Sequence, residues 1–333
     1  MNPPTKTLAL RHAAFGDPKD VLCLEEIALP ALAPNSVALH MLAAPVNPAD
    51  FGRINGSYGQ LADLPATAGV EGVAEVVQLG SEITRFKIGE RVLLPAGTGS
   101  WQTYAHAEES SLFRAPASLS RLEAAMFWIN PPTAWLLMRD FADLKPGDWI
   151  VQNAATSAVG KLVIQFANHL GIRTVNLVRD PSAAPNLLAL GANHVFKDDR
   201  DSAKSIREAL GATKAKLGLN AVGGSSALTI AKVLADDASL VTFGGVDREP
   251  APFPTRHLIF NNLALRGFWV SRWYDQTPRE SIEAMHQEIA QLMKTGSIDS
   301  DVAATYPLQN WGEALAHSVR PGKPGKVLFD LNQ

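Results

Sequence analysis

Hydrophobic and polar residues alternate in two different ways along the chain. Up to about residue 120, short runs of Val, Ala and Leu are bounded by Gly, Pro and Asn, and the clearest are Ser36–Met41, Gly72–Leu79 and Arg91–Leu94. Runs of this length and composition predict strands. From about Leu122, strand-length segments alternate with helix-length segments, which is typical of βαβ units and a parallel sheet. The pattern therefore predicts a β-rich unit followed by an α/β unit.

The clearest βαβ unit begins with the apolar strand Trp149–Gln152. A helix with Val/Ile/Phe spacing follows at Val159–Leu170, and a second strand follows at Thr174–Val178. Together they fill the roughly 30 residues that such a unit needs. The remaining predicted elements are strands at Lys216–Val222, Ser239–Phe243 and Lys326–Leu331, and a helix from Pro278 to about Thr295.

Length and composition indicate two compact units and small-molecule partners. The chain has 333 residues, more than a single core of roughly 250–300 residues accommodates. Its net charge of −3 gives no reason to expect binding to nucleic acid or to an anionic membrane. The first residues lack the pattern of a targeting peptide, and no apolar run reaches the roughly 18 residues of a membrane span. We therefore expect a cytoplasmic protein.

Potential metal ligands are few and scattered. Cys23 is the only cysteine, which excludes an intramolecular disulfide and a cysteine-rich metal site. The eight histidines include no His-x-x-x-His or Glu-x-x-His pair. We expect no metal site.

The turn after the first strand of the βαβ unit consists almost entirely of small residues, from Asn153 to Gly160. Small residues allow close approach of a pyrophosphate, and the start of the following helix favours its negative charge. Ala154 and Ser157 replace the first two glycines of the dinucleotide motif, and Gly160 keeps the third. The turn predicts a phosphate-binding site, and a tightly packed turn without a ligand is the alternative.

Two further segments bear on the cofactor. Arg179 and Asp180 follow the second strand, where an arginine can pair with the 2′-phosphate of NADPH and an acidic residue can hold the ribose of NAD. We favour NADPH, and the alternative is that Asp180 serves NAD while Arg179 is a solvated loop charge. Gly244-Gly245 follows a later strand and indicates a close backbone approach or a plain turn.

Several segments resemble the quinone-reductase branch of the medium-chain dehydrogenase/reductase family, and within it the mitochondrial-type trans-2-enoyl-thioester reductases. The similar segments include Asn47-Pro48-Ala49-Asp50, Asn55-Gly56-Ser57-Tyr58-Gly59, residues 69–76, Asn130-Pro131-Pro132-Thr133-Ala134, Val178-Arg179-Asp180 and Arg266-Gly267-Phe268-Trp269. The resemblance implies an α/β fold in which a doubly wound Rossmann domain binds NADPH and a β-rich GroES-like domain is catalytic. The boundaries expected are 123–270 for the Rossmann domain, and 1–122 with 271–333 for the GroES-like domain. A homodimer is implied by the same family analogy.

The resemblance also indicates a zinc-independent member. Zinc-binding members carry Gly-His-Glu where this chain has Gly69-Val70-Glu71, and Asn47 lies near the position of a cysteine ligand. Glu71 is then expected to be a structural carboxylate.

Tyr58 is the candidate catalytic residue. Its phenol can donate a hydrogen bond to a developing enolate oxygen, or deliver the proton directly or through water. Taken alone, a tyrosine in a glycine-rich loop is more often structural. The resemblance favours catalysis, because Tyr58 matches the tyrosine essential in the enoyl reductases.

The resemblance further implies which residues line the NADPH site: Asn47, Asn130, Thr133, Thr156, Ser157, Ala158, Val159, Arg179, Gly244, Gly245, Phe268, Trp269 and Lys326. The chain has Pro181 where close relatives carry a second arginine, which predicts a weaker preference for NADPH. Trp269 and Trp273 are candidates for the wall of an acyl pocket, or are ordinary core residues.

The function expected is NADPH-dependent reduction of an activated C=C bond, most closely that of a 2-enoyl thioester carried by CoA or a carrier protein. Hydride would reach the β-carbon and a proton the α-carbon. A quinone or small-enone reductase on the same scaffold is the close alternative. A non-enzymatic NADPH-binding protein is the alternative from another class.

Overall fold

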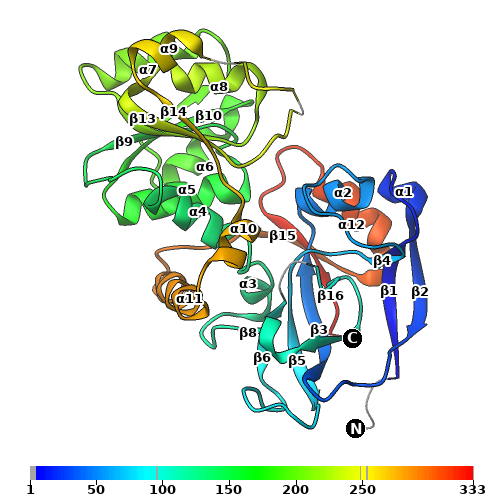
Figure 1. Cartoon of the computed structure of the whole chain (residues 1–333). Helices are drawn as coiled ribbons and strands as arrows, with labels where there is room; N and C mark the ends of the chain where they lie inside the picture. Colours follow the sequence, from blue (N-terminus) through cyan, green and yellow to red (C-terminus); the bar gives the residue numbers. More distant parts are fainter. Residues whose placement is uncertain (1–4, 95–96, 248, 253, 333) are drawn as a thin grey trace. The chain divides into compact units, whose positions relative to one another are not determined.

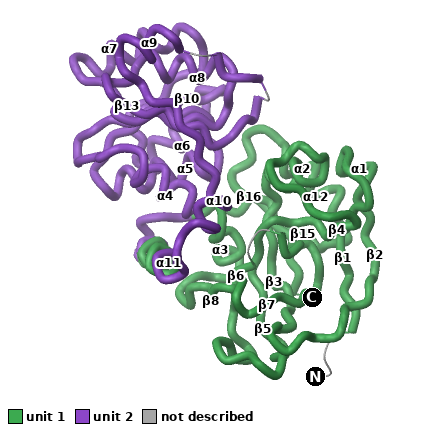
Figure 2. The backbone as a smooth tube through the Cα atoms, viewed as in Figure 1, with its two compact units in different colours: residues 1–129, 283–291, 300–333 green, residues 130–282, 292–299 purple. Residues whose placement is uncertain are grey.

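The computed structural model describes residues 5–332, except residues 95, 96, 248 and 253. The chain divides into two compact units, coloured separately in Figure 2. Unit 1 comprises residues 1–129, 283–291 and 300–333, and unit 2 comprises residues 130–282 and 292–299. The first boundary lies later than the expected 122/123 because α3 (Arg121–Ala125) packs on the strands of unit 1. The chain returns to unit 1 within α11 (Arg279–Lys294), which contributes residues to both units, rather than at 270/271.

Unit 2 is built on a six-stranded parallel sheet in the order β11-β10-β9-β12-β13-β14. Its strands are β9 (Trp149–Gln152), β10 (Arg173–Val178), β11 (His194–Lys197), β12 (Ala215–Asn220), β13 (Leu234–Thr242) and β14 (Ala264–Gly267). Numbered from β9, this is the 3-2-1-4-5-6 order of the Rossmann fold. The expected doubly wound sheet is confirmed.

Helices cover both faces of this sheet, with α4 to α6 on one side and α7 to α9 on the other (Figure 1). The helical segments are α4 (Asn130–Arg139), α5 (Ala158–His169), the 3₁₀ turn η2 (Pro181–Ala183), α6 (Ala184–Ala189), α7 (Ser202–Leu210), α8 (Gly224–Ala231), α9 (Thr255–Phe260) and α10 (Val270–Gln276). Strand residues such as Val151, Val175 and Leu217 are fully buried because helices enclose the sheet on both sides.

Unit 1 contains two sheets among its described residues. One has the order β2-β1-β4, and the other the order β15-β16-β3-β5-β6-β8 with β7 also paired to β3. The strands are β1 (Lys6–His12), β2 (Leu22–Ala28), β3 (Ser36–Pro45), β4 (Ala66–Thr67), β5 (Gly72–Leu79), β6 (Arg91–Leu94), β7 (Tyr104–Glu108), β8 (Phe113–Arg114), β15 (Val302–Pro307) and β16 (Lys326–Asp330). The helical segments are α1 (Pro18–Val21), α2 (Pro48–Asn55), η1 (Glu109–Ser111), η3 (Leu308–Asn310) and α12 (Trp311–Ser318).

The larger sheet of unit 1 joins distant parts of the chain. β16 pairs with β15 in parallel and with β3 in antiparallel orientation. The core on this sheet includes Trp101 and Phe329, whose rings meet edge to face at 5.1 Å between centroids. None of the described helices in either unit is long and apolar enough to cross a membrane.

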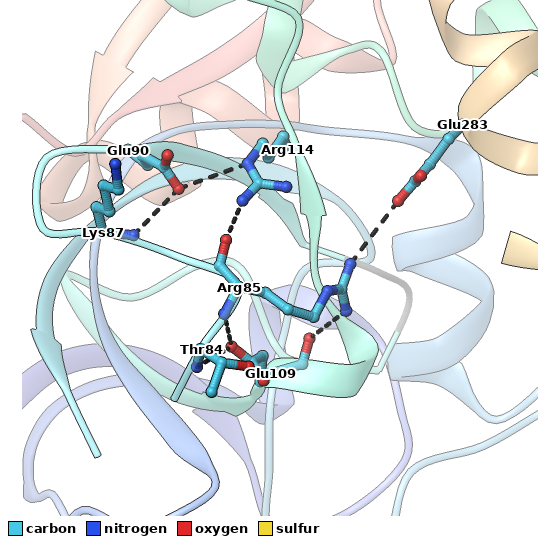
Figure 3. Close-up of polar contacts among 7 residues, drawn as sticks. All are labelled: Thr84, Arg85, Lys87, Glu90, Glu109, Arg114 and Glu283. Atoms are coloured by element: carbon cyan, nitrogen blue, oxygen red, sulfur yellow. Dashed lines mark hydrogen bonds and ion pairs between the residues drawn. The ribbon is translucent and has the colours of Figure 1, made fainter. Parts of the chain in front are cut away.

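A cluster of ion pairs and hydrogen bonds connects Glu283 of α11 to loops of unit 1 (Figure 3). The guanidinium of Arg85 lies 3.7 Å from Glu283 of α11 and donates to the backbone oxygen of Glu109. The carboxylate of Glu109 in turn accepts the backbone N–H of Arg85 at 2.5 Å, and Arg114 donates to the backbone oxygen of Arg85. Arg114 also lies 3.6 Å from the carboxylate of Glu90. Because these side chains are partly exposed, each of the two ion pairs contributes at most about 1 kcal/mol, and the cluster mainly orients the loops.

Because Gly160 has no side chain, α5 packs closely against the turn that follows β9. A Cβ at this position would lie 2.7 Å from the backbone oxygen of Ala154 and 2.8 Å from the Cα of Ala155. Both neighbours are backbone atoms and cannot rotate away. The turn therefore tolerates only glycine at this position without moving the helix.

We expect Gly160→Ala to lower the free energy of unfolding by about 1–3 kcal/mol, because it overpacks the contact between helix and turn. Urea denaturation followed by tryptophan fluorescence measures the change. The matched control is Gly312→Ala in α12, where a Cβ would meet nothing within 4 Å, so stability should stay unchanged or rise slightly. Equal losses for the two variants would contradict the packing argument.

Candidate active site

The carboxyl end of β9 leads into the predicted phosphate-binding turn. Ala154 has φ 48°, in the left-handed region that glycine normally occupies, at a position where the dinucleotide motif has glycine. Ser157 is the N-cap of α5, and its hydroxyl accepts the backbone N–H of Gly160 at 3.1 Å. The 12-residue helix α5 thus begins at this turn, and the backbone N–H groups of its first turn favour a bound anion. Thr156, Ala158 and Val159 belong to the same turn and helix start.

Buried amides fix the shape of this sheet edge. The side-chain amide of Asn153 donates to Asn220 at 2.7 Å and to the hydroxyl of Ser226 at 2.8 Å, and its oxygen accepts the N–H of Ala221. Asn220 donates to the hydroxyl of Thr242 at 3.0 Å. The ends of β9, β12 and β13 are therefore held together by side chains that the sequence analysis missed. The available signal was Asn153 directly after β9 and Asn220 as the last residue of β12.

The carboxylate of Asp180 forms a hydrogen bond within its own turn. Its carboxylate accepts the backbone N–H of Ser182 at 2.9 Å at the start of η2, and hydrogen bonds from Ser182 hold the pKa of Asp180 below its usual range. Arg179, directly after β10, is exposed and forms no ion pair with the described residues. Of the two residues weighed for cofactor choice, the arginine is the one whose side chain is available.

The other predicted residues of unit 2 lie on α4 or just after the carboxyl ends of β13 and β14. Asn130 and Thr133 lie buried on α4, and the amide nitrogen of Asn130 has no hydrogen-bond partner among the described residues. Gly244 follows β13, where a Cβ would meet the backbone oxygen of Ala221 at 2.9 Å, whereas Gly245 is unobstructed. Phe268 extends β14 by donating its N–H to Thr242.

The two tryptophans proposed for an acyl pocket lie at α10. Trp269 is its N-cap, and the backbone N–H of Trp273 donates to the Trp269 oxygen. Trp273 packs edge to face on Tyr274 at 5.6 Å between ring centroids. The structure therefore brings them together on one helix, and their role in a pocket stays a prediction.

Tyr58 lies in unit 1, just after α2. The helix ends at Gly56 with φ 82°, and the backbone N–H of Tyr58 donates to the oxygen of Gly52 at 3.1 Å. A Cβ on Gly52 would lie only 3.2 Å from the tyrosine ring. Gly52 thus leaves the room in which the ring rests, a positioning role that the sequence analysis missed.

Asn47 and Lys326, both predicted cofactor residues, belong to one network in unit 1. The amide of Asn47 donates to Glu71 at 2.8 Å, and its oxygen accepts the ammonium group of Lys326. The other carboxylate oxygen of Glu71 accepts the N–H of Ile129 at 3.0 Å. Burial raises the pKa of Glu71 to about 7 and lowers the pKa of Lys326 to about 8. Glu71 is accordingly a buried structural carboxylate whose two oxygens are occupied by N–H donors.

The positions at which the resemblance would place zinc ligands are occupied by Asn47 and Val70. Asn47 bridges Glu71 and Lys326, and Val70 contributes a buried apolar side chain. Among the residues that the structure describes, no three His, Cys, Asp or Glu side chains are grouped so as to hold a metal ion.

Comparison with known proteins places this architecture in a family. Residues 33–117 match the alcohol dehydrogenase GroES-like domain, and residues 158–291 match the model described as zinc-binding dehydrogenase. The chain is 37% identical to human mitochondrial enoyl-[acyl-carrier-protein] reductase, over 98% of this chain and 90% of the human protein. It is 38% identical to the *Caenorhabditis elegans* enzyme of the same name, over 93% and 91% of the two chains.

The chain belongs to the medium-chain dehydrogenase/reductase family. The resemblance inferred from the sequence is thus confirmed. Among solved structures, this family member is similar to the complex of Etr1p with NADP and crotonyl-CoA, with a TM-score of 0.89 and 28% identity over 98% of this chain and 99% of the other. It is also similar to a *Bacillus thuringiensis* protein provisionally named an NADPH:quinone reductase, with a TM-score of 0.91 and 27% identity over the same shares. The roles of individual residues stay predictions.

Proposed function

We propose that the protein is a zinc-independent, NADPH-dependent reductase of the C=C bond in 2-enoyl thioesters. The observation that carries the proposal is the nearly full-length match to enoyl-[acyl-carrier-protein] reductases, together with a tyrosine held after α2 at the expected position. The similar Etr1p structure contains both NADP and crotonyl-CoA.

The residues present fit a dinucleotide. Gly160 and Gly244 allow close backbone packing at the sheet edge that a Cβ would obstruct, and the position of Gly245 is open. The buried amide nitrogen of Asn130 lacks a partner among the described residues, so it can donate to a carboxamide oxygen. Arg179 is exposed and forms no ion pair with the described residues, so its guanidinium is available for a 2′-phosphate. In this assignment the remaining predicted residues also line the cofactor site, and Lys326 presents its ammonium group to the anionic cofactor.

NADPH, when bound, supplies the hydride that reaches the β-carbon of the substrate. Tyr58 donates a hydrogen bond to the thioester carbonyl oxygen, on which negative charge develops as the enolate forms. The α-carbon then takes up a proton, from the phenol directly or through water. No zinc is required, because the tyrosine supplies the polarisation and the positions of the zinc ligands hold Asn47 and Val70.

A quinone or small-enone reductase is the second candidate. The similarity to the *Bacillus thuringiensis* protein, with a TM-score of 0.91, favours it. The two activities differ in substrate and share the cofactor site, so only substrates distinguish them.

We expect Tyr58→Phe to lower kcat with crotonyl-CoA about 10²–10³-fold, as the loss of one oxyanion donor does. NADPH affinity should stay unchanged, because the hydroxyl acts on the substrate. Steady-state kinetics with crotonyl-CoA, hexenoyl-CoA, quinones and methyl vinyl ketone, with fluorescence titration of NADPH, gives both quantities. Activity with quinones or the enone alone would refute the enoyl assignment. NADPH binding without turnover of any substrate, unaffected by the substitution, would indicate a non-enzymatic protein.

Arg179→Glu should weaken NADPH binding by at least about tenfold more than NADH binding, because a carboxylate repels the 2′-phosphate that the guanidinium attracts. Titration of both cofactors against the variant checks this. Asp180→Ala is the neighbouring control, and we expect it to leave the ratio of the two affinities unchanged. Equal weakening of both cofactors by Arg179→Glu would contradict the assigned contact.

We further propose a homodimer formed at the β14 edge of the cofactor-binding sheet. Leu265 on this strand is 41% exposed, and nearby Ile259 and Phe260 are 67% and 72% exposed. An exposed strand edge beside apolar side chains favours pairing with a second copy. Light scattering should give twice 35.7 kDa, and Phe260→Glu should shift the protein to monomer. Ile88→Glu, at an equally exposed apolar position of unit 1, should not; a monomeric wild type would refute the proposal.

A cytoplasmic location stays the prediction made from the sequence, and the relatives described above are named as mitochondrial proteins.

A further inference from the structure

Asp50, on α2, is a buried carboxyl group that the proposed reaction does not use. The residue is only 1% exposed. Its Oδ2 accepts the backbone N–H of Asn47 at 2.7 Å, and the backbone N–H of Val70 also acts on the carboxyl and lowers its pKa. Its Oδ1 has no hydrogen-bond partner among the described residues. A buried oxygen without a donor is an unfavourable place for negative charge.

The nearby carboxyl of Glu71 is the opposite case. One of its oxygens accepts the amide of Asn47 and the other accepts the N–H of Ile129. Donors to both oxygens favour the ionised form. Of the two carboxyls, Glu71 is therefore the one suited to carry the charge.

The charges of the cluster do not balance when every group is ionised. Asp50 and Glu71 would contribute two negative charges, and Lys326 one positive charge. A net buried charge is unfavourable, and one proton on a carboxyl removes it. Burial raises the pKa of Asp50 to about 7, although hydrogen bonding to the backbone N–H of Asn47 lowers it. Burial raises the pKa of Glu71 to about the same value, so the choice between the two carboxyls rests on the unpartnered Oδ1 of Asp50.

The other charged or titratable groups near Asp50 do not compensate the negative charge that this carboxyl would carry if it were ionised. Arg53, on the same helix, and His12, on β1, line a small pocket together with Asp50. Neither contributes to the shift in the pKa of Asp50, and His12 bonds to the backbone oxygen of Ala14. The charge of Lys323 acts on Lys326, whose pKa it lowers.

The pocket offers the proton a way to exchange. It has a volume of about 10 Å³ and is only partly enclosed, which is room for about one water molecule. Its walls include Thr67, Ala68 and the glycines Gly69, Gly97 and Gly99. A water there can carry protons between solvent and the buried carboxyl.

We propose that Asp50 is a proton-binding site: at mildly acidic pH it holds one proton on Oδ1, which balances the buried Asn47–Glu71–Lys326 network. The group is then a positioning residue. When Asp50 is neutral, the ammonium group of Lys326 stays charged and hydrogen-bonded to Asn47, and the cluster as a whole carries no net charge. Because the pKa of Asp50 is raised, the proton is held below about pH 7 and lost above it, which adds a negative charge beneath Lys326. This second step rests on the proposed function, in which Lys326 contacts the anionic cofactor.

Infrared spectroscopy of the protein without cofactor tests the proton itself. At pH 6 we expect a protonated-carboxyl C=O band that shifts when aspartate is ¹³C-labelled, is absent in Asp50→Asn, and fades as the pH rises through about 7. Asp63→Asn, an exposed aspartate of the same unit, is the matched control and should retain the band. A band that shifts only with ¹³C-labelled glutamate, or no band in the wild type, would overturn the proposal.

The dependence of NADPH affinity on pH tests the positioning role. Between pH 6.5 and 8 the dissociation constant of the wild type should rise about three- to tenfold, within the limit of tenfold per pH unit for one linked proton. Asp50→Asn, which stays neutral, should show a flatter profile, and Asp63→Asn should follow the wild type. Parallel profiles for wild type and Asp50→Asn would overturn the positioning role. Failure of the proposed function would appear separately, as loss of the Arg179 effect on cofactor choice with the infrared result intact.

Discussion

The buried carboxylate of Glu71 is the interaction on which unit 1 most depends. Through Asn47 it is linked to the ammonium group of Lys326 on β16 and to the start of α2, and it accepts the N–H of Ile129 at the end of the unit's first segment. A carboxylate of this kind is stable in the interior only while its donors stay in place. The start of α2 is therefore fixed. The turn that carries Tyr58 begins directly after Gly56, the C-cap of this helix, so its position depends on that of α2.

In unit 2 the corresponding constraint is polar and neutral. Amides and hydroxyls at the ends of three neighbouring strands satisfy one another, so the sheet edge keeps its shape without a net charge. An edge that is ordered before any ligand arrives loses little entropy on binding a dinucleotide. The two units thus solve the same problem, rigid support for a site, with different chemistry.

Much of the fold could be predicted because the local signals were strong. β5, β6 and β9 begin and end where short apolar runs meet glycine, proline or polar residues. The strand, turn and helix of the predicted phosphate-binding segment were located despite two replaced glycines, since strand, small-residue turn and helix follow one another directly. The chain could not reveal that Asn153 bonds to Asn220 and Ser226, 67 and 73 residues away. It also could not show that Asp50 is buried, because a helix-start aspartate ordinarily faces solvent. Gly52 was overlooked for a related reason, because its importance lies in the neighbouring ring of Tyr58, which a Cβ at this position would crowd.

The place of β16 in its sheet has a consequence for how the protein is made. Unit 2 is encoded almost entirely by one continuous stretch, so it can fold while the rest of the chain is still being synthesised. The larger sheet of unit 1 cannot close until β16 arrives to pair with β3. Lys326 comes with that strand, 279 residues after Asn47. Until then the early part of unit 1 holds two acidic side chains with no cation between them, and it must remain open on the ribosome with both of them in water.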